Sequence, residues 1–200
     1  MNDVTNNEEQ VDIRWNKAIE LYRSGDKSGA LFMFKAFVND GELAAIREVA
    51  NIYEQPSSGG VEQDFKKTRK WYARSIEEAD DVYGCIGLGR MLYYGKGGPR
   101  DYNMAFEYYS MIEDKDIPVV NLMFGRMYSL GHGVIKDYDK SIYYYQKAIK
   151  GGNLIALKDL GLLEIEMKKY VHGIYHYLKA AINIIIALTR SKHDPRLRTQ

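Results

Sequence analysis

The sequence predicts an all-α protein built from helix-pair repeats of about 36 residues. The segment LGRMLYYGKGGPRDYNMAFEYY, which begins at Leu88, aligns without a gap on FGRMYSLGHGVIKDYDKSIYYY, which begins at Phe124. In each segment apolar residues recur at helical spacing, and a glycine-rich step separates two such runs. A period of this length carried by two amphipathic helices is typical of an α-solenoid.

Each repeat is predicted to contain two helices joined by a glycine loop. In one copy the helical spacing covers Val119–Leu130 and then Tyr138–Ile149. Gly131 and Gly133 lie between these runs, where glycine ends a helix by adopting the left-handed conformation without a Cβ clash. Asp137 is predicted to cap the second helix. The loop lacks the Lys-Ser/Thr pair and the preceding strand of a phosphate-binding loop, so its glycines are predicted to be structural.

Weaker copies extend the series in both directions. The second aromatic residue of each copy recurs at intervals of 38, 37, 36 and 32 residues, at Phe34, Tyr72, Tyr109, Tyr145 and Tyr177. We expect residues 1–10 to be disordered, residues 11–189 to form one solenoid and residues 190–200 to be a mobile basic tail. The predicted repeats are 11–43, 44–81, 82–118, 119–154 and 155–189.

A small residue recurs inside the first helix of each repeat, at Ala50, Gly89, Gly125 and Gly161. Glycine inside a helix costs up to about 1 kcal/mol relative to alanine. Close approach of the neighbouring helix would offset that cost. We therefore expect helices to touch at these positions, with the paired aromatic residues packed between successive helix pairs.

These residues resemble the Sel-1-like repeat family, which is related to the tetratricopeptide repeat. The family pattern is close to A-x-x-x-L-G-x-L-Y-x-x-G-x-G-V-x-x-D-x-x-K-A-x-x-W-Y-x-K-A-A-x-x-G, and FGRMYSLGHGVIKDYDKSIYYYQKAIKGG matches most of it. The resemblance covers about residues 43–182. It implies a right-handed α/α superhelix that binds proteins, without catalytic chemistry, a cofactor or a metal. The chain departs from the cysteine-rich branch of the family, because its single cysteine has nothing to pair with.

The resemblance also implies where a partner binds, because the first helix of each such repeat lines the concave face. Arginine and tyrosine, which are enriched at interface hot spots, occur on these helices. The predicted partner-binding residues are Arg47, Asn51, Tyr83, Arg90, Tyr93, Tyr94, Leu122 and Arg126. The alternative is that the arginines form ordinary surface ion pairs and the tyrosines pack between repeats.

The composition limits which classes of partner and which cellular location are expected for the protein. The chain has 200 residues, and 28 Lys plus Arg against 27 Asp plus Glu give a net charge of +1, so neither a nucleic acid nor a membrane is expected as a partner. One cysteine permits no intrachain disulfide. No apolar run approaches the roughly 20 residues that span a bilayer, and the start MNDVTNNEEQ does not resemble a signal peptide. We expect a cytoplasmic protein.

Three residues are candidates for chemistry, and none is expected to carry it. His172 and His176 lie one helical turn apart, but no third ligand completes a metal site beside them, although Glu164 and Glu166 are near in sequence. Cys85 is predicted to be a small buried side chain rather than a nucleophile. No hydrolase, metalloprotease or phosphate-binding motif is present. The sequence predicts that the protein is not an enzyme.

The last predicted helix differs from the others, because Ile182, Ile184, Ile185, Ile186 and Leu188 crowd several of its faces. A terminal repeat normally presents a polar outer face, so this helix is a candidate for a homodimer or partner surface. The leading hypothesis is a non-enzymatic scaffold that binds one protein, such as a bacterial immunity protein for a toxin or an adaptor. The alternatives are a structural homo-oligomer and a metal-dependent or thiol enzyme.

Overall fold

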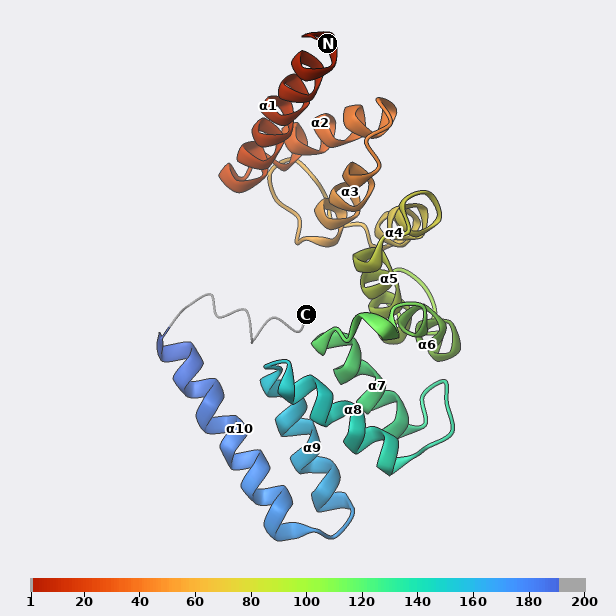
Figure 1. The fold of residues 1–200 in the computed structure, drawn as a ribbon, viewed down its shortest axis with the longest axis vertical. Coiled ribbons are helices and arrows are strands. Elements are labelled where there is room, and N and C mark those ends of the chain that lie inside the picture. The colour runs from red at the N-terminus through yellow and green to blue at the C-terminus, as the bar shows by residue number, and fades with distance from the viewer. Residues whose placement is uncertain (1, 191–200) are drawn as a thin grey trace. The chain divides into compact units, whose positions relative to one another are not determined.

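The computed structural model describes residues 2–190, and it describes side chains for residues 13–186 and residue 189. Within this part the regular elements are ten α-helices and one short 3₁₀ helix, η1 (Figure 1). The α-helices are α1 (Asn2–Ser24), α2 (Lys27–Asn39), α3 (Ala44–Glu54), α4 (Phe65–Ala79), α5 (Val82–Tyr94), α6 (Tyr102–Ser110), α7 (Pro118–Leu130), α8 (Tyr138–Lys150), α9 (Leu154–Glu166) and α10 (Tyr170–Arg190), and η1 is Glu113–Lys115.

The helices follow one another as five pairs, which confirms an all-α repeat fold. The helices predicted over Val119–Leu130 and Tyr138–Ile149 are observed as α7 and α8, each extended by one residue. α1 is drawn from Asn2, within the stretch 1–10 for which the sequence predicts disorder; that disorder stays a prediction. The predicted mobile tail lies outside the described residues, apart from Arg190 at the end of α10.

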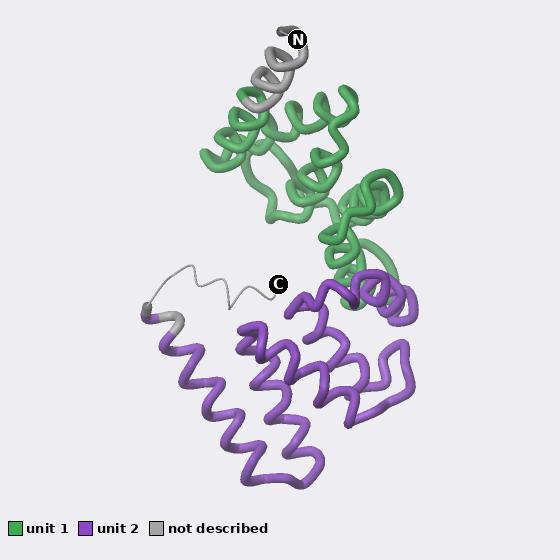
Figure 2. The backbone as a smooth tube through the Cα atoms, viewed as in Figure 1, with its two compact units in different colours: residues 1–100 green, residues 101–200 purple. Residues whose placement is uncertain are grey.

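The chain divides into two compact units, residues 1–100 and residues 101–200 (Figure 2). The core of the first unit is aromatic: Phe34 and Phe37 of α2 are buried, and the Trp15 ring lies 5.2 and 5.3 Å from their rings. A core cluster of the second unit joins α7, α8 and α9 through Leu122, Tyr145 and Leu160. Each unit thus buries the facing sides of its own consecutive helix pairs.

An aspartate caps the second helix of three successive repeats. The side chains of Asp64, Asp101 and Asp137 accept hydrogen bonds from backbone N–H groups three residues later, at distances of 2.9 to 3.0 Å. These bonds satisfy N–H groups that have no partner within the helix. The predicted cap at Asp137 is confirmed, and the repeat explains why the same cap recurs.

The second glycine of each loop fits against the preceding repeat. Gly97 and Gly133 have φ values of +78° and +74°. A Cβ atom at Gly97 would overlap the carbonyl oxygen of Phe65 at the start of α4, and one at Gly133 would overlap that of Tyr102 at the start of α6. The loop glycines therefore permit both a left-handed backbone and close backbone contact between consecutive repeats.

The glycines inside the first helices mark the places where helices touch. A Cβ atom at Gly125 would lie 2.5 Å from the Tyr145 ring. At Gly161 the neighbour is backbone, since a Cβ atom would lie 2.7 Å from the amide nitrogen of Tyr177 and 2.8 Å from the carbonyl oxygen of Gly173. The expected close approach is confirmed at both positions.

None of the helices within residues 2–190 combines the length and the apolar character that a membrane span requires. The cytoplasmic location stays a prediction.

Candidate protein-docking site

Within the first unit, α3 and α5 carry six of the eight predicted partner-binding residues. Arg47 and Asn51 are four residues apart on α3, and so share one face of that helix. Tyr83, Arg90 and Tyr94 are separated by seven and four residues on α5, which places them on one face as well. We call these five residues the α3–α5 face.

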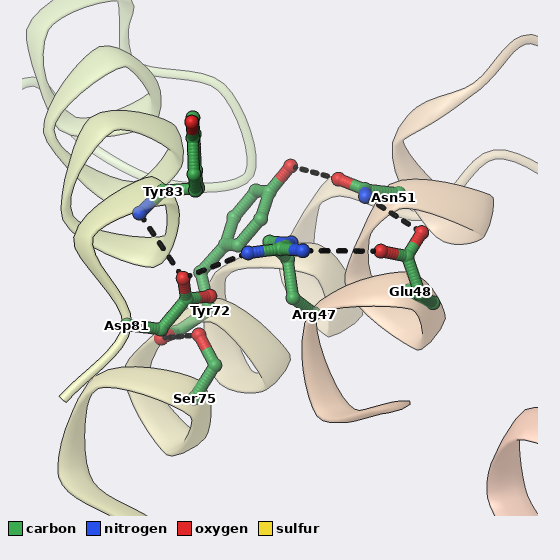
Figure 3. A network of polar contacts seen from close by, with 7 residues as sticks. All are labelled: Arg47, Glu48, Asn51, Tyr72, Ser75, Asp81 and Tyr83. Carbon is green, nitrogen blue, oxygen red and sulfur yellow. Dashed lines mark hydrogen bonds and ion pairs between the residues drawn. The ribbon is translucent and has the colours of Figure 1, made fainter. Parts of the chain in front are cut away.

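Arg47 connects the two helices. Its Nη1 donates to Oδ1 of Asp81 at 3.0 Å, and its Nη2 lies 3.4 Å from Oε1 of Glu48 (Figure 3). The guanidinium also lies over the Tyr83 ring, 5.1 Å from its centre. Asp81 is itself the N-cap of α5, because its Oδ1 accepts from the backbone N–H of Tyr83 at 3.1 Å. One carboxylate thus fixes both the start of α5 and the arginine beneath Tyr83.

Asn51 belongs to the same network. Its Nδ2 donates to Glu48 at 3.1 Å, and its Oδ1 lies 2.8 Å from the hydroxyl oxygen of Tyr72 (Figure 3). The Tyr72 hydroxyl also lies 2.8 Å from Oε2 of Glu54. Burial, and secondly the charge of Glu54, raise the pKa of Tyr72 far above its ordinary value, so the hydroxyl keeps its proton and acts as a donor.

Arg90 is paired with Glu54 in a similar way. Its Nη2 lies 2.5 and 2.7 Å from the two carboxylate oxygens, and the side chains are only 21% and 12% exposed. Arg47 and Arg90 therefore carry compensated charges rather than forming an open basic strip. The pairing of Arg47 and Arg90 matches the alternative given for the arginines, that they form ion pairs.

The tyrosines of α5 differ in exposure. Tyr83 is 63% exposed and Tyr94 is 40% exposed, whereas Tyr93 is buried. The prediction that Tyr93 contacts a partner needs correction, because each helical residue is turned by about 100° from the one before and position 93 faces inward. Its ring lies 5.0 Å from that of Tyr94 and supports it edge-on.

The remaining two predicted residues lie in the second unit. Leu122 is 1% exposed within the core cluster that contains Tyr145 and Leu160, so its assignment to a docking surface is also corrected. An apolar side chain on α7 is stabilised there by burial between helices. The Nε atom of Arg126 donates to Oδ2 of Asp159 at 2.7 Å, which pairs this arginine across α7 and α9.

Sequence reasoning missed the carboxylates that hold the arginines. Asp81 had a usable signal, because aspartate is a favoured N-cap residue and Asp81 directly precedes the predicted repeat 82–118. Glu54 had a weaker one, since it lies 36 residues before Arg90, one repeat away. Tyr72 was identified as the second aromatic residue of its repeat, but its hydrogen bonds to Asn51 and Glu54 depend on the packing of α4 against α3.

Two of the residues considered for chemistry, Cys85 and His176, are buried or paired with a carboxylate in the packed helices. Cys85 is buried, and burial together with the charge of Asp81 raises the pKa of its thiol. Nδ1 of His176 lies 2.7 Å from Oε2 of Glu164, which joins α10 to α9. Among the described residues, no three His, Cys, Asp or Glu side chains gather as a metal site would require.

The Sel1 repeat model matches residues 43–80, 82–115 and 122–153, just over half of the chain. The chain belongs to the Sel1 repeat family. Repeats of this family are typically protein-interaction scaffolds, and each matched segment contains one helix pair or most of one. A search of curated protein sequences found no match.

Solved structures support the same fold. The Sel1 repeat protein from Oxalobacter formigenes superposes with a TM-score of 0.64 at 24% identity, over 81% of this chain and 69% of that one. The protective antigen c5321 of uropathogenic Escherichia coli gives a TM-score of 0.69 at 23% identity, over 85% of this chain but only 38% of that protein. The immunity protein Pa5087 from Pseudomonas aeruginosa matches at 18% identity with a TM-score of 0.42, too low to bear on function.

Proposed function

We propose that this Sel1 repeat protein is a non-enzymatic scaffold that binds a protein partner on the α3–α5 face. The observation that carries the proposal is the exposed Tyr83 ring, which lies against Arg47, while Arg47 is held by Asp81 and Glu48. Tyr94 supplies a second exposed ring on the same face of α5. Eleven residues separate the two tyrosines, or about 16 Å along the helix.

Two supported aromatic rings are a suitable pair of anchors. Tyrosine buries a large area at a low cost in side-chain entropy, and it often dominates the energy of an interface. The contacts with Arg47 and Tyr93 restrict the two rings before a partner arrives, which lowers the ordering cost of binding. Because the arginines are already paired, we expect affinity to come from the rings and to depend weakly on salt.

The test compares the Tyr83→Ala/Tyr94→Ala double variant with wild type and with Tyr143→Ala. Tyr143 is a matched control, since it is 54% exposed but lies on α8. A partner captured from host extract by wild type and by Tyr143→Ala is then purified and titrated against all three proteins by calorimetry. We expect the double variant to weaken binding at least about 100-fold and the control to change it less than about threefold. Equal affinity for the double variant would refute the proposed face.

Charge reversal of Arg47 or Arg90 would be a poorer test of the α3–α5 face than the tyrosine variants. Arg47→Glu would place a third carboxylate beside Asp81 and Glu48, and Arg90→Glu would face Glu54. Both changes would destabilise the first unit through like-charge repulsion, so a loss of binding would have two explanations. The tyrosine variants leave this network intact.

The more specific roles stay predictions. An immunity role would make the partner a toxin, and an adaptor role would make it a component of another assembly. The identity of the captured partner distinguishes these two roles. The proposal that the chain is not an enzyme is supported by the buried Cys85 thiol and by the pairing of His176 with Glu164.

A further inference from the structure

In the first unit, α4 and the loop that follows α5 bring several basic residues together. A Cβ atom at Gly97 would lie 3.0 Å from the amide nitrogen of Lys66, so the loop runs against the first turn of α4. Arg69 of α4 fixes the loop in this place, because its Nε donates to the carbonyl oxygen of Lys96 at 2.6 Å. The loop residues Lys96 and Arg100 are thereby brought alongside the lysines of α4.

The cations of this region differ in how their charges are compensated. Lys67 pairs with Asp64 at 3.2 Å, and Arg74 pairs with Glu78 at 2.7 Å. For four others, no carboxylate among the side chains that the structure describes lies within ion-pair distance. We call these four residues the basic patch: Lys66, Lys70, Lys96 and Arg100. All but the half-buried Lys96 are exposed.

The lysines of α4 in the basic patch point away from α3. Tyr72 marks the side of α4 that packs on α3, because its hydroxyl lies 2.8 Å from Asn51. Each helical residue is turned by about 100° from the one before, so Lys70 and Lys66 lie about 200° and 240° from Tyr72. The basic patch is therefore a different surface from the α3–α5 face.

The repeat itself does not require cations at these positions. The N-cap aspartates Asp64, Asp101 and Asp137 align α4 with α6 and α8. In this alignment an amide, two carboxylates and a phenol replace the two lysines of α4. Lys66 corresponds to Asn103 and Asp139, and Lys70 corresponds to Glu107 and Tyr143. Since helix pairs with these other side chains fold in the same way, the basic patch is a property of one repeat and needs an explanation beyond the fold.

The aromatic rings beside the basic patch are covered by cations. Nζ of Lys96 lies 5.4 Å from the centre of the Phe65 ring, and the guanidinium of Arg74 lies 5.3 Å from that of Trp71. Proteins that bind single-stranded nucleic acids stack bases on exposed rings, and these two rings are occupied. The whole chain has a net charge of only +1, so its attraction for a long polyanion is confined to this small surface. Carboxylates, by contrast, need only the cations.

We propose that the basic patch is a second docking surface, which binds an acidic segment of a protein, one rich in aspartate and glutamate. Lys66 and Lys70 are one helical turn apart, about 6 Å. Alternate side chains of an extended segment lie on one side of it, about 7 Å apart, so two carboxylates can pair with the two lysines at once. Arg100 adds a planar fork for a further carboxylate.

The two docking surfaces are expected to respond differently to salt. Ion pairs at an exposed surface are screened, so binding to the basic patch should weaken strongly as salt is added. Binding to the α3–α5 face is expected to depend weakly on salt, because that face binds through aromatic rings. The inference stands independently of the function proposed for the α3–α5 face.

The experiment titrates the full chain into fluorescein-labelled octaglutamate and follows fluorescence anisotropy. Wild type is expected to bind at about 20 mM salt and to lose at least about tenfold in affinity at about 200 mM. Lys66→Gln/Lys70→Gln is expected to bind about tenfold more weakly at the lower salt concentration. Glutamine has nearly the helix propensity of lysine, so this variant should unfold at the temperature of wild type.

Lys169→Gln/Lys179→Gln is the matched control, since it removes two exposed lysines from the second unit and changes the net charge equally. It is expected to change the affinity less than about twofold. Tyr83→Ala/Tyr94→Ala should bind octaglutamate as wild type does, which separates this test from that of the α3–α5 face.

Three results would overturn the proposal. The first is a wild type that does not bind octaglutamate, and the second is a Lys66→Gln/Lys70→Gln variant that binds it as tightly as the control does. The third is tighter binding of labelled octathymidylate than of octaglutamate, which would assign the basic patch to a nucleic acid. Sedimentation with phosphatidylserine vesicles that only the Lys66→Gln/Lys70→Gln variant loses would likewise replace the acidic protein segment with a membrane surface.

Discussion

The contact between α9 and α10 provides a test in which two physical effects have opposite signs. Replacing Gly161 with alanine improves helix propensity by about 1 kcal/mol. The same replacement puts a Cβ atom 2.7 Å from the amide nitrogen of Tyr177 and 2.8 Å from the carbonyl oxygen of Gly173. The sign of the change in folding free energy shows which effect dominates.

The structure indicates that the steric overlap outweighs the gain in helix propensity. Both close atoms belong to the backbone of α10, which cannot turn aside as a flexible side chain could, so the two helices must separate by several tenths of an ångström. Separation of that size forfeits part of the dispersion contact along the whole helix pair, and overpacking of this kind costs about 1–3 kcal/mol. After the gain in propensity of about 1 kcal/mol, we expect Gly161→Ala to be less stable than wild type by up to about 2 kcal/mol.

Equilibrium unfolding in urea, followed by far-ultraviolet circular dichroism at one protein concentration, measures this difference. Lys179→Ala is the control, because it changes an exposed position of α10 and is expected to shift stability by less than about 0.5 kcal/mol. A Gly161→Ala protein as stable as wild type, or more stable, would show that the α9–α10 contact is looser than described.

Two further predictions concern the first and second units in turn. Arg90→Met is expected to lower the free energy of unfolding by about 2 kcal/mol in the same assay, because it leaves the Glu54 carboxylate, which is 12% exposed, without its cation. The control is Arg74→Met, in the exposed pair with Glu78, which is expected to lower it by less than about 0.5 kcal/mol. Equal losses of stability in the two variants would contradict this explanation. Burial raises the pKa of Tyr145 to about 12, so the folded state holds a proton that the unfolded state releases above pH 10, and stability falls as the pH rises from about 10 to 12. Between pH 8 and pH 11 Tyr145→Phe should lose about 1.4 kcal/mol less stability than wild type, and an identical pH dependence would contradict the raised pKa.

The sequence by itself determined the repeat period, the ends of the helices and the role of the glycines. These features depend on a few neighbouring residues: the spacing of apolar side chains sets each helix, Asp137 caps one, and Gly133 allows the backbone to turn. Because such preferences act locally, two aligned copies of the repeat were enough to predict α7 and α8 to within a residue.

The state of each candidate docking residue was decided only by the tertiary structure. Arg47, Arg90 and Arg126 are all paired with carboxylates at least 33 residues away in sequence, and no spacing rule within one helix places those partners. Leu122 and Tyr93 are buried in the core for a related reason. The outward or inward direction of a helical side chain depends on which neighbouring helices cover it, and that depends on how whole repeats pack together.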